Sequence, residues 1–174
     1  MSPWRWLFRV LSHDVASADE ALVAGLLADV AALQRFLQAR EVDLNRRLQQ
    51  LADESPSTDP DAVNAKATGR SKSAAAKAHL RAKAAADAPR LKDEMDAGRL
   101  SGEHLDAFAA AVAELAAHLR PALLALQDEL AAEAGARGLT VEQGRAHLRA
   151  GVRGIVADDG QHRLALQRRR TGLR

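Results

Sequence analysis

Apolar residues that follow the first dozen positions recur at the spacing of an amphipathic α-helix. One stripe has strict seven-residue spacing, and its members are Val23, Val30, Leu37, Leu44 and Leu51. Leu26 and Leu33 occupy the companion position in the first repeats, and Arg40 and Arg47 occupy it in the later ones. The pattern predicts one long helix that starts at a capping box, Ser17 to Glu20, and runs to about Leu51. Such a stripe packs either within the chain's own bundle or against a second copy as a coiled coil.

A segment of proline and small polar residues interrupts this apolar pattern. It reads Asp53-Glu-Ser-Pro-Ser-Thr-Asp-Pro60 and contains no hydrophobic residue. Two prolines among such residues are typical of a connection between packed units. We therefore predict an N-terminal segment with the long helix at 1–52, a linker at 53–70, and a helical domain with a basic C-terminal tail at 71–174.

The sequence after the linker predicts several shorter helices. An Ala-rich helix follows Ser71 and ends before Pro89, and a short amphipathic helix over 91–97 ends at Gly98. Ser101 is placed to cap the next helix. Its apolar positions, at steps of three and four residues, are Leu105, Phe108, Val112, Leu115 and Leu119.

The last third of the chain continues the helical pattern with two interruptions. Pro121 suits the first turn of a helix over 123–134, and glycines at 135 and 138 end that helix. A second capping box, Thr140 to Gln143, opens the final helix. Asp158-Asp-Gly160 predicts a turn before the basic tail.

Composition favours an all-α fold. The chain has 39 Ala and 25 Leu but only one Ile, three Phe, two Trp and no Tyr. Ala and Leu are strong helix formers, while β-branched and aromatic residues fill strands. The fold class predicted is therefore an all-α helical bundle with a long heptad-bearing helix near the N-terminus. The Ala, Arg and Gly bias indicates a high-GC bacterial gene, for which we expect a cytoplasmic, non-membrane protein.

Charge is divided along the chain into three blocks. Residues 66–92 hold eight Lys and Arg with one acid, 93–142 hold ten acids with three Arg, and 145–174 hold eight Arg with two acids. Dense basic stretches suit a polyanion such as duplex DNA, because phosphate contacts release counterions. The candidate nucleic-acid-binding residues are Lys72, Lys77, Arg81, Lys83, Arg163, Arg168, Arg169 and Arg170. These side chains could instead pair with the acidic block inside one bundle.

No catalytic or metal-binding pattern emerges from the sequence. The chain lacks cysteine, and its six histidines form no His-x-x-x-His pair. Gly135-Ala-Arg-Gly138 lacks the lysine of a phosphate-binding loop, and no serine nucleophile elbow is present. We therefore expect no enzyme activity, no cofactor and no metal in this chain.

Three stretches resemble a known family. They are Ala88-Pro-Arg-Leu-Lys-Asp-Glu-Met-Asp-Ala-Gly-Arg-Leu-Ser-Gly-Glu-His104, Leu139-Thr-Val-Glu-Gln143, and Asp158-Asp-Gly160 with Arg163-Leu-Ala-Leu-Gln-Arg-Arg-Arg170. These stretches follow one another in an order similar to that in the helical domain that precedes HNH endonuclease domains in many actinobacterial proteins. That domain is catalogued as domain of unknown function two hundred and twenty-two, in a repetitive-element family. The resemblance implies a DNA-associated role, with cleavage supplied in full-length relatives by a metal-dependent HNH module. We expect this chain to be truncated before that module.

Two functions follow as expectations. The first is a non-catalytic helical module of an HNH-nuclease-type protein that contacts the DNA backbone or positions a nuclease partner. The second is a structural protein that forms a homodimer through the long helix. The homodimer would use the seven-residue stripe, Val23, Val30, Leu37, Leu44 and Leu51.

Overall fold

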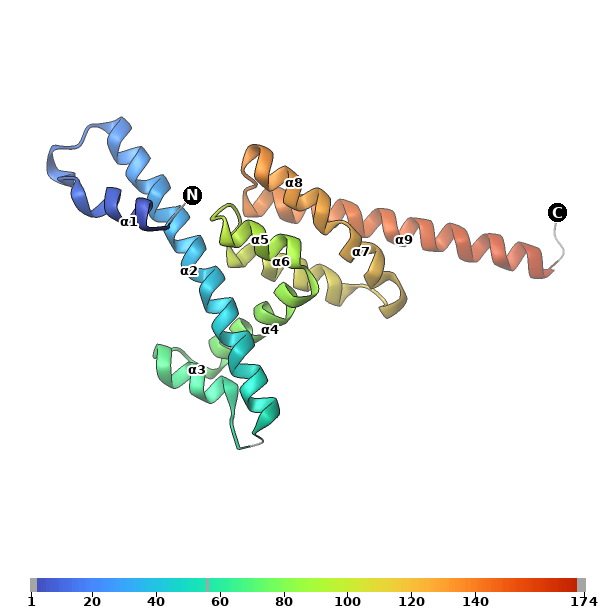
Figure 1. Ribbon diagram of the computed structural model, residues 1–174. Coiled ribbons are helices and arrows are strands. Elements are labelled where there is room, and N and C mark those ends of the chain that lie inside the picture. The colour runs from blue at the N-terminus through green and yellow to red at the C-terminus, as the bar shows by residue number, and fades with distance from the viewer. Residues whose placement is uncertain (1–2, 56, 172–174) are drawn as a thin grey trace.

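A computed structural model describes residues 3–55 and 57–171, and every regular element in this part of the chain is a helix (Figure 1). This confirms the predicted all-α class. None of these helices is long and apolar enough to cross a membrane. The helices are α1 (Pro3–Ser12), η1 (Val15–Ser17), α2 (Glu20–Glu54), α3 (Pro60–Thr68), α4 (Lys72–Asp87), α5 (Pro89–Asp96), α6 (Gly102–Glu114), η2 (Ala117–Leu119), α7 (Arg120–Ala125), α8 (Gln127–Arg137) and α9 (Val141–Thr171).

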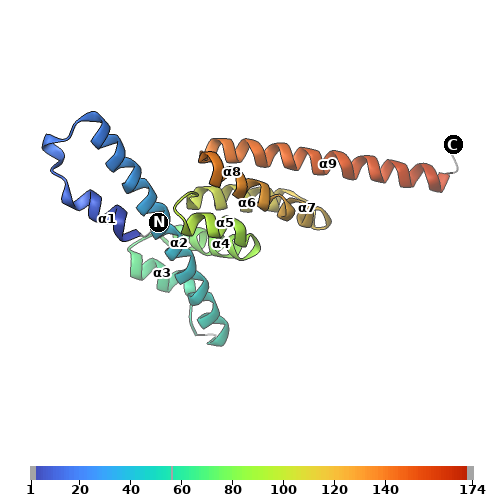
Figure 2. The same ribbon diagram turned by 45° about the horizontal axis from the view of Figure 1, so that its top comes forward.

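Two long helices lie on opposite sides of a group of shorter ones (Figures 1 and 2). On one side α2 packs against α1, α4 and α5. On the other side α9 packs against α6 and α7, and its C-terminal end projects away from the other helices. Helix α6 contacts both α4 and α9, so it lies between the two basic parts of the sequence.

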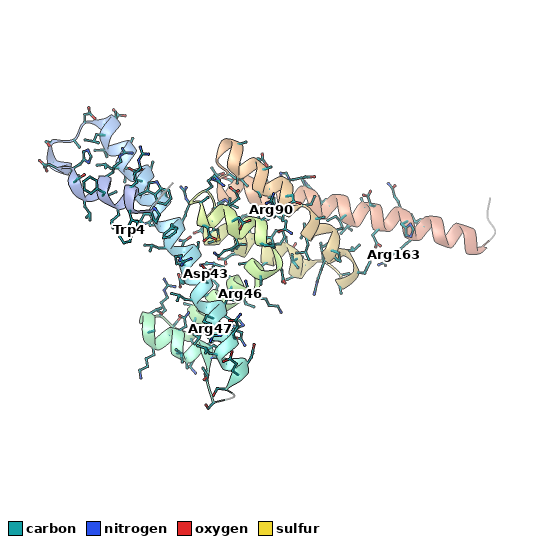
Figure 3. All side chains as sticks on the ribbon, in the orientation of Figure 1. Trp4, Asp43, Arg46, Arg47, Arg90 and Arg163 are labelled. Atoms are coloured by element: carbon teal, nitrogen blue, oxygen red, sulfur yellow. The ribbon has the colours of Figure 1, made fainter. Side chains whose placement is uncertain are left out.

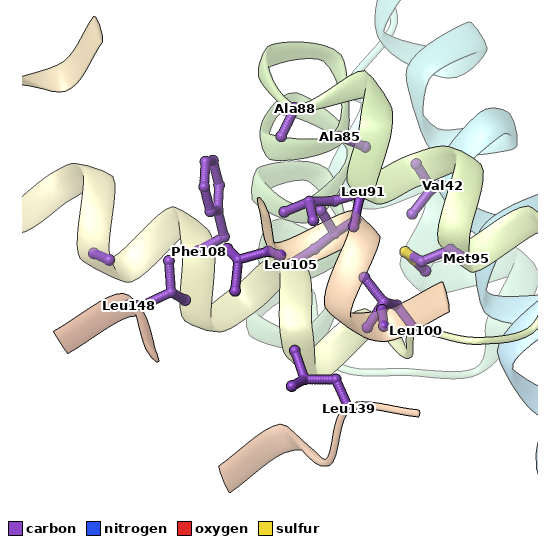
Figure 4. Packing of buried hydrophobic residues seen from close by; sticks show 14 of the residues in the cluster. Val42, Ala85, Ala88, Leu91, Met95, Leu100, Leu105, Phe108, Leu139 and Leu148 are labelled. Atoms are coloured by element: carbon purple, nitrogen blue, oxygen red, sulfur yellow. The ribbon is translucent and has the colours of Figure 1, made fainter. Parts of the chain in front are cut away.

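The core is built mainly from α4, α5, α6 and α8, with Ala39 and Val42 contributed by α2 (Figure 4). Its fully buried large side chains are Phe108, Met95, Leu100, Leu105 and Leu123. Alanines fill much of the remaining interface, which permits close helix approach but buries little apolar area per residue. Because α2 supplies core residues, the predicted 1–52 segment packs into the same core as the helices after residue 71.

Helix α2 also satisfies the polar backbone of the turn between α5 and α6. The Arg35 Nη1 donates to the Gly98 carbonyl at 2.7 Å, and the Gln38 side-chain oxygen accepts from the Gly102 amide at 2.8 Å. Gly98 has φ 73°, a left-handed conformation, and the ring of buried Trp6 lies against it. These contacts join α1, α2 and the α5–α6 turn.

His104 closes the other end of this turn. Its Nδ1 accepts from the Ser101 amide at 3.1 Å, so its Nε2 carries the hydrogen and donates to the Leu139 carbonyl at 3.0 Å. The Ser101–His104 pair forms a capping box in which histidine replaces the usual glutamate. Burial of the ring lowers the pKa of His104, because the charged form is poorly solvated there.

Several predicted helix ends agree with the structure. Ser71 caps α4 through a bond from the Ala74 amide, and α5 ends just before Gly98. Thr140 and Gln143 form the predicted reciprocal cap of α9, with distances of 3.0 and 3.2 Å. These ends depend on local hydrogen bonds, which explains why sequence patterns located them.

Other predicted boundaries were wrong. The cap of α2 is Asp19, which accepts from the Leu22 amide at 2.8 Å, while Ser17 lies in η1. Asp158-Asp-Gly160 is not a turn but part of α9. Asp159 pairs with Arg163 one turn later at 2.9 Å, which supports continuation of the helix. Gly135 likewise lies inside α8, whereas Gly138, with φ 67°, ends it.

The predicted linker at 53–70 contains a helix. Asp59 caps α3, and Pro60 occupies its first turn. The buried Asn64 side chain donates to Asn45 of α2, and Arg70 forms an ion pair with Glu41. Polar contacts rather than apolar burial attach α3 to α2, so a search for hydrophobic periodicity missed it.

The seven-residue stripe of α2 is divided into a covered and an uncovered half. In the first half Val23 and Val30 are half-buried, and Leu26 at the companion position is buried. In the second half Leu37 and Leu44 are 57% and 70% exposed. The core side of α2, carrying Ala39 and Val42, lies on the opposite face of the helix.

Candidate nucleic-acid interface

The predicted cations of α4 divide into paired and unpaired side chains. Arg81 donates to both carboxylate oxygens of Asp106 on α6, at 2.9 and 2.7 Å. Lys77 lies 3.1 Å from the same carboxylate, and Lys72 lies 3.7 Å from Asp59. Lys83 is exposed and has no ion-pair partner within the described residues.

Asp106 of α6 forms a charge cluster with Arg81 and Lys77 of α4. Burial by itself raises the pKa of Asp106, but hydrogen bonds from Arg81 and Lys77 outweigh it, so the pKa lies below its ordinary value. The same hydrogen bond raises the pKa of Arg81, against the opposing effect of desolvation. Arg81 therefore serves mainly in packing, as one sequence alternative had allowed, and is not free for a polyanion.

A groove of about 450 Å³ lies between α4 and α6. Its apolar surface comes from Leu80, Ala84, Ala109 and Val112, and the cations at its border include Lys83 and Arg120. Leu80 is 60% exposed, so the groove is open to solvent.

A second groove, of about 420 Å³, lies between α6 and α9. Arg145, Arg149 and Arg153 form a row along it at four-residue steps. All three are exposed, and none forms an ion pair within the described residues. The remaining lining is apolar apart from Glu114, and comprises Ala107, Ala110, Ala111, Leu148 and Val152.

The two grooves meet on α6, because Ala110 lines both. Lys83 of α4 borders the surface on one side, and the arginine row of α9 borders it on the other. Figure 2 shows α6 between α4 and α9. The fold thus places cations from both basic stretches around one alanine-lined helix. We call Lys83, Ala110 and the three arginines the α6 surface.

The predicted arginines near the C-terminus lie farther along α9. Arg163 pairs with Asp159, and its Nη2 lies 3.1 Å from His118 Nε2 at η2 (Figure 3). The side chains of the predicted residues Arg168, Arg169 and Arg170 lie outside the described part of the structure, although their backbone belongs to α9.

Sequence reasoning missed the arginine row itself. Its signal was present, since three arginines at four-residue steps lie on neighbouring turns of one helix face. The predicted list favoured the denser Arg cluster at 168–170. What separates the row from most of the other predicted cations is that none of its three arginines forms an ion pair within the described residues, and that depends on tertiary packing.

The described residues contain no group of three His, Asp or Glu side chains arranged to hold a metal ion. The nearest arrangement is His147, whose Nδ1 lies 3.1 Å from Glu133 while its Nε2 lies 3.8 Å from Glu129. Because Glu129 and Glu133 approach different ring nitrogens of His147, these contacts connect α8 to α9 and do not converge on one metal ion.

No protein-family model matches the sequence, and neither the curated proteins nor the solved structures include a match.

Proposed function

We propose that this chain is a non-catalytic helical module that contacts the phosphate backbone of duplex DNA through the α6 surface. The observation that carries the proposal is the row Arg145, Arg149 and Arg153, which is exposed and free of ion pairs within the described residues. Arginine suits this role because its planar guanidinium binds phosphate in a bidentate manner and stays charged. A cytoplasmic location, where bacterial DNA is accessible, is part of the proposal.

The geometry favours a polymer of phosphates over a single small anion. Four-residue steps separate successive arginines by about 6 Å along the helix axis, so the row spans about 12 Å. A site for one phosphate would instead converge its donors on one point. Cations on the two sides of α6 suit a broad, repeating anionic surface.

The chemistry of the surface favours a duplex over a single strand. Single-strand binding commonly uses aromatic side chains on which bases stack. Phe108 is the aromatic residue among those lining the two grooves, and it is only 1% exposed. Because the α6 surface would contact the phosphate backbone and not the base edges, we expect its affinity to depend only weakly on the DNA sequence.

The resemblance to the helical domain of HNH-nuclease proteins supports the same role. In this proposal the module holds duplex DNA while a nuclease partner or HNH module supplies the cleavage chemistry. Cleavage of plasmid DNA by the purified chain with Mg²⁺ or Mn²⁺ would contradict the non-catalytic part.

The test replaces Arg145, Arg149 and Arg153 together by Gln. A matched control replaces Arg40, Arg47 and Arg90 by Gln, which removes the same charge. These control arginines are 61%, 56% and 64% exposed, and each has a carboxylate partner.

Fluorescence anisotropy with a labelled duplex at low salt measures the affinity of both variants. We expect the α9 variant to bind about tenfold more weakly or worse, since it loses three phosphate contacts. The control should bind within about twofold of the unmodified chain, because its charges are compensated. Equal weakening of both variants would mean that net charge alone governs binding, and the α6 surface would lose its role.

A further inference from the structure

The side chains that line the two grooves beside α6 are either charged or apolar. Among the described residues, the lining includes no Ser, Thr, Asn, Gln, His or Tyr. In the groove next to α9, Ala110 is exposed and Ala107 and Val152 are half-buried. We call Ala107, Ala110 and Val152 the apolar floor. Its side chains offer neither a hydrogen-bond donor nor an acceptor.

The backbone of the apolar floor is also occupied. Ala107 and Ala110 lie inside α6, and Val152 lies inside α9. In the interior of an α-helix the amides and carbonyls bond to one another, so they are not free for a ligand. A hydroxyl group pressed against the floor would therefore lose its hydrogen bonds to water and gain none in return.

The apolar floor lies directly beside the arginine row. Val152 is three residues after Arg149 and one residue before Arg153, so it borders the interval between these two arginines on α9. In a nucleic-acid strand each pair of neighbouring phosphates is joined through a sugar. A strand whose phosphates contact Arg149 and Arg153 would therefore place a sugar against Val152 and the facing alanines of α6.

Carboxylates near the grooves do not supply the missing acceptor. Asp106 is engaged by Arg81 and Lys77. Glu114 lines the groove next to α9, but it is the last residue of α6. Its negative charge would repel the two phosphates that flank any sugar beside it. A sugar hydroxyl thus gains no favourable partner from either carboxylate.

We propose that the apolar floor makes the α6 surface selective for DNA over RNA, because it accommodates a deoxyribose and rejects a ribose 2′-hydroxyl. The 2′-hydroxyl is the group by which proteins distinguish the two nucleic acids, and an A-form RNA duplex displays it along its wide, shallow groove. This inference rests on the proposed backbone contact and specifies the sugar chemistry that the contact selects.

Fluorescence anisotropy at low salt tests this selectivity with three labelled duplexes of one sequence. They are a DNA duplex, an RNA duplex, and an RNA duplex that carries fluorine in place of every 2′-hydroxyl. Fluorine removes the hydroxyl donor but keeps the A-form sugar pucker, so the third duplex separates the effect of the hydroxyl from that of helix shape.

We expect the RNA duplex to bind about tenfold more weakly than the DNA duplex, since a buried hydroxyl would be left unpaired. The 2′-fluoro duplex should bind within about threefold of the DNA duplex. Equal affinity for DNA and RNA would overturn the selectivity while leaving the backbone contact intact. A 2′-fluoro duplex that binds as weakly as RNA would overturn it too, because helix shape would then decide. No binding of any duplex would overturn the selectivity and the proposed function together.

Ala110→Ser assigns the effect to the apolar floor. It adds a hydroxyl that can both donate and accept, at an exposed position where little bulk is introduced. The ratio of RNA affinity to DNA affinity should rise about fivefold. The matched control is Ala132→Ser, at an exposed position of α8 outside both grooves, and it should leave the ratio unchanged. An unchanged ratio in Ala110→Ser, or an equal rise in the control, would overturn the role of the floor.

Discussion

Replacement of Gly98 by Ala tests whether the α5–α6 turn joins α1 and α2 to the core. Gly98 has φ 73°, a conformation that costs a residue with a Cβ atom about 1–2 kcal/mol. A Cβ atom there would lie 2.9 Å from Trp6 Cη2 and 3.2 Å from the carbonyl oxygen of Ala32. Trp6 is only 5% exposed, so its ring has little room to move away.

The clash adds to the conformational cost. Forcing an extra methyl group into a packed site costs about 1–3 kcal/mol. We therefore expect Gly98→Ala to lower the free energy of unfolding by about 3 kcal/mol in all. Gly69→Ala is the matched control, because Gly69 has φ 69° and a Cβ atom added to it would meet nothing within 4 Å. It should lose only the conformational part, about 1–2 kcal/mol.

Urea unfolding followed by far-UV circular dichroism measures both losses on the same helical signal. The predicted difference between the two variants, about 1–2 kcal/mol, comes from contact with Trp6 and Ala32. If Gly98→Ala and Gly69→Ala lose the same stability, α1 does not pack tightly on the turn. In that case Trp6 would not attach α1 to α2 and the turn either.

Two further predictions concern buried polar groups. Because burial lowers the pKa of His104, its contribution to stability is full above pH 6.5 and is lost as the pH falls towards the lowered pKa. Urea midpoints between neutral and mildly acidic pH should show this decline, and His104→Gln should flatten it; an unchanged slope would contradict the buried neutral ring. Asp106→Asn should cost about 2–3 kcal/mol, because it leaves the 16% exposed Arg81 side chain without its carboxylate. Asp128→Asn, at an exposed pair, should cost under about 0.5 kcal/mol by the same assay, and equal losses would refute the role of Asp106.

Local sequence signals located most of the helices. The Ala and Leu bias indicated the all-α class, and caps at Ser101 and Thr140 indicated two helix starts. Each of these signals depends on hydrogen bonds within a few residues. The missed helix α3 is short, and its attachment to α2 depends on Asn64 and Asn45, which are polar and distant in sequence.

The candidate interface was only partly predictable because charge pairing is a tertiary property. The sequence showed that 66–92 and 145–174 are basic, but not which cations have carboxylate partners. Arg81 and Asp106 are 25 residues apart and meet through the packing of α4 on α6. The arginine row stays free of ion pairs within the described residues because α9 faces alanines of α6 and one carboxylate, Glu114.

The salt dependence of duplex binding tests the proposed function most directly. The logarithm of the binding constant should fall linearly with the logarithm of the salt concentration, with a slope of about −0.9 for each phosphate neutralised. Replacing Arg145, Arg149 and Arg153 by Gln should reduce the magnitude of that slope by about 2.7. The control at Arg40, Arg47 and Arg90 should leave it unchanged. The absence of binding at the lowest salt, or an unchanged slope in the α9 variant, would contradict DNA contact through the α6 surface.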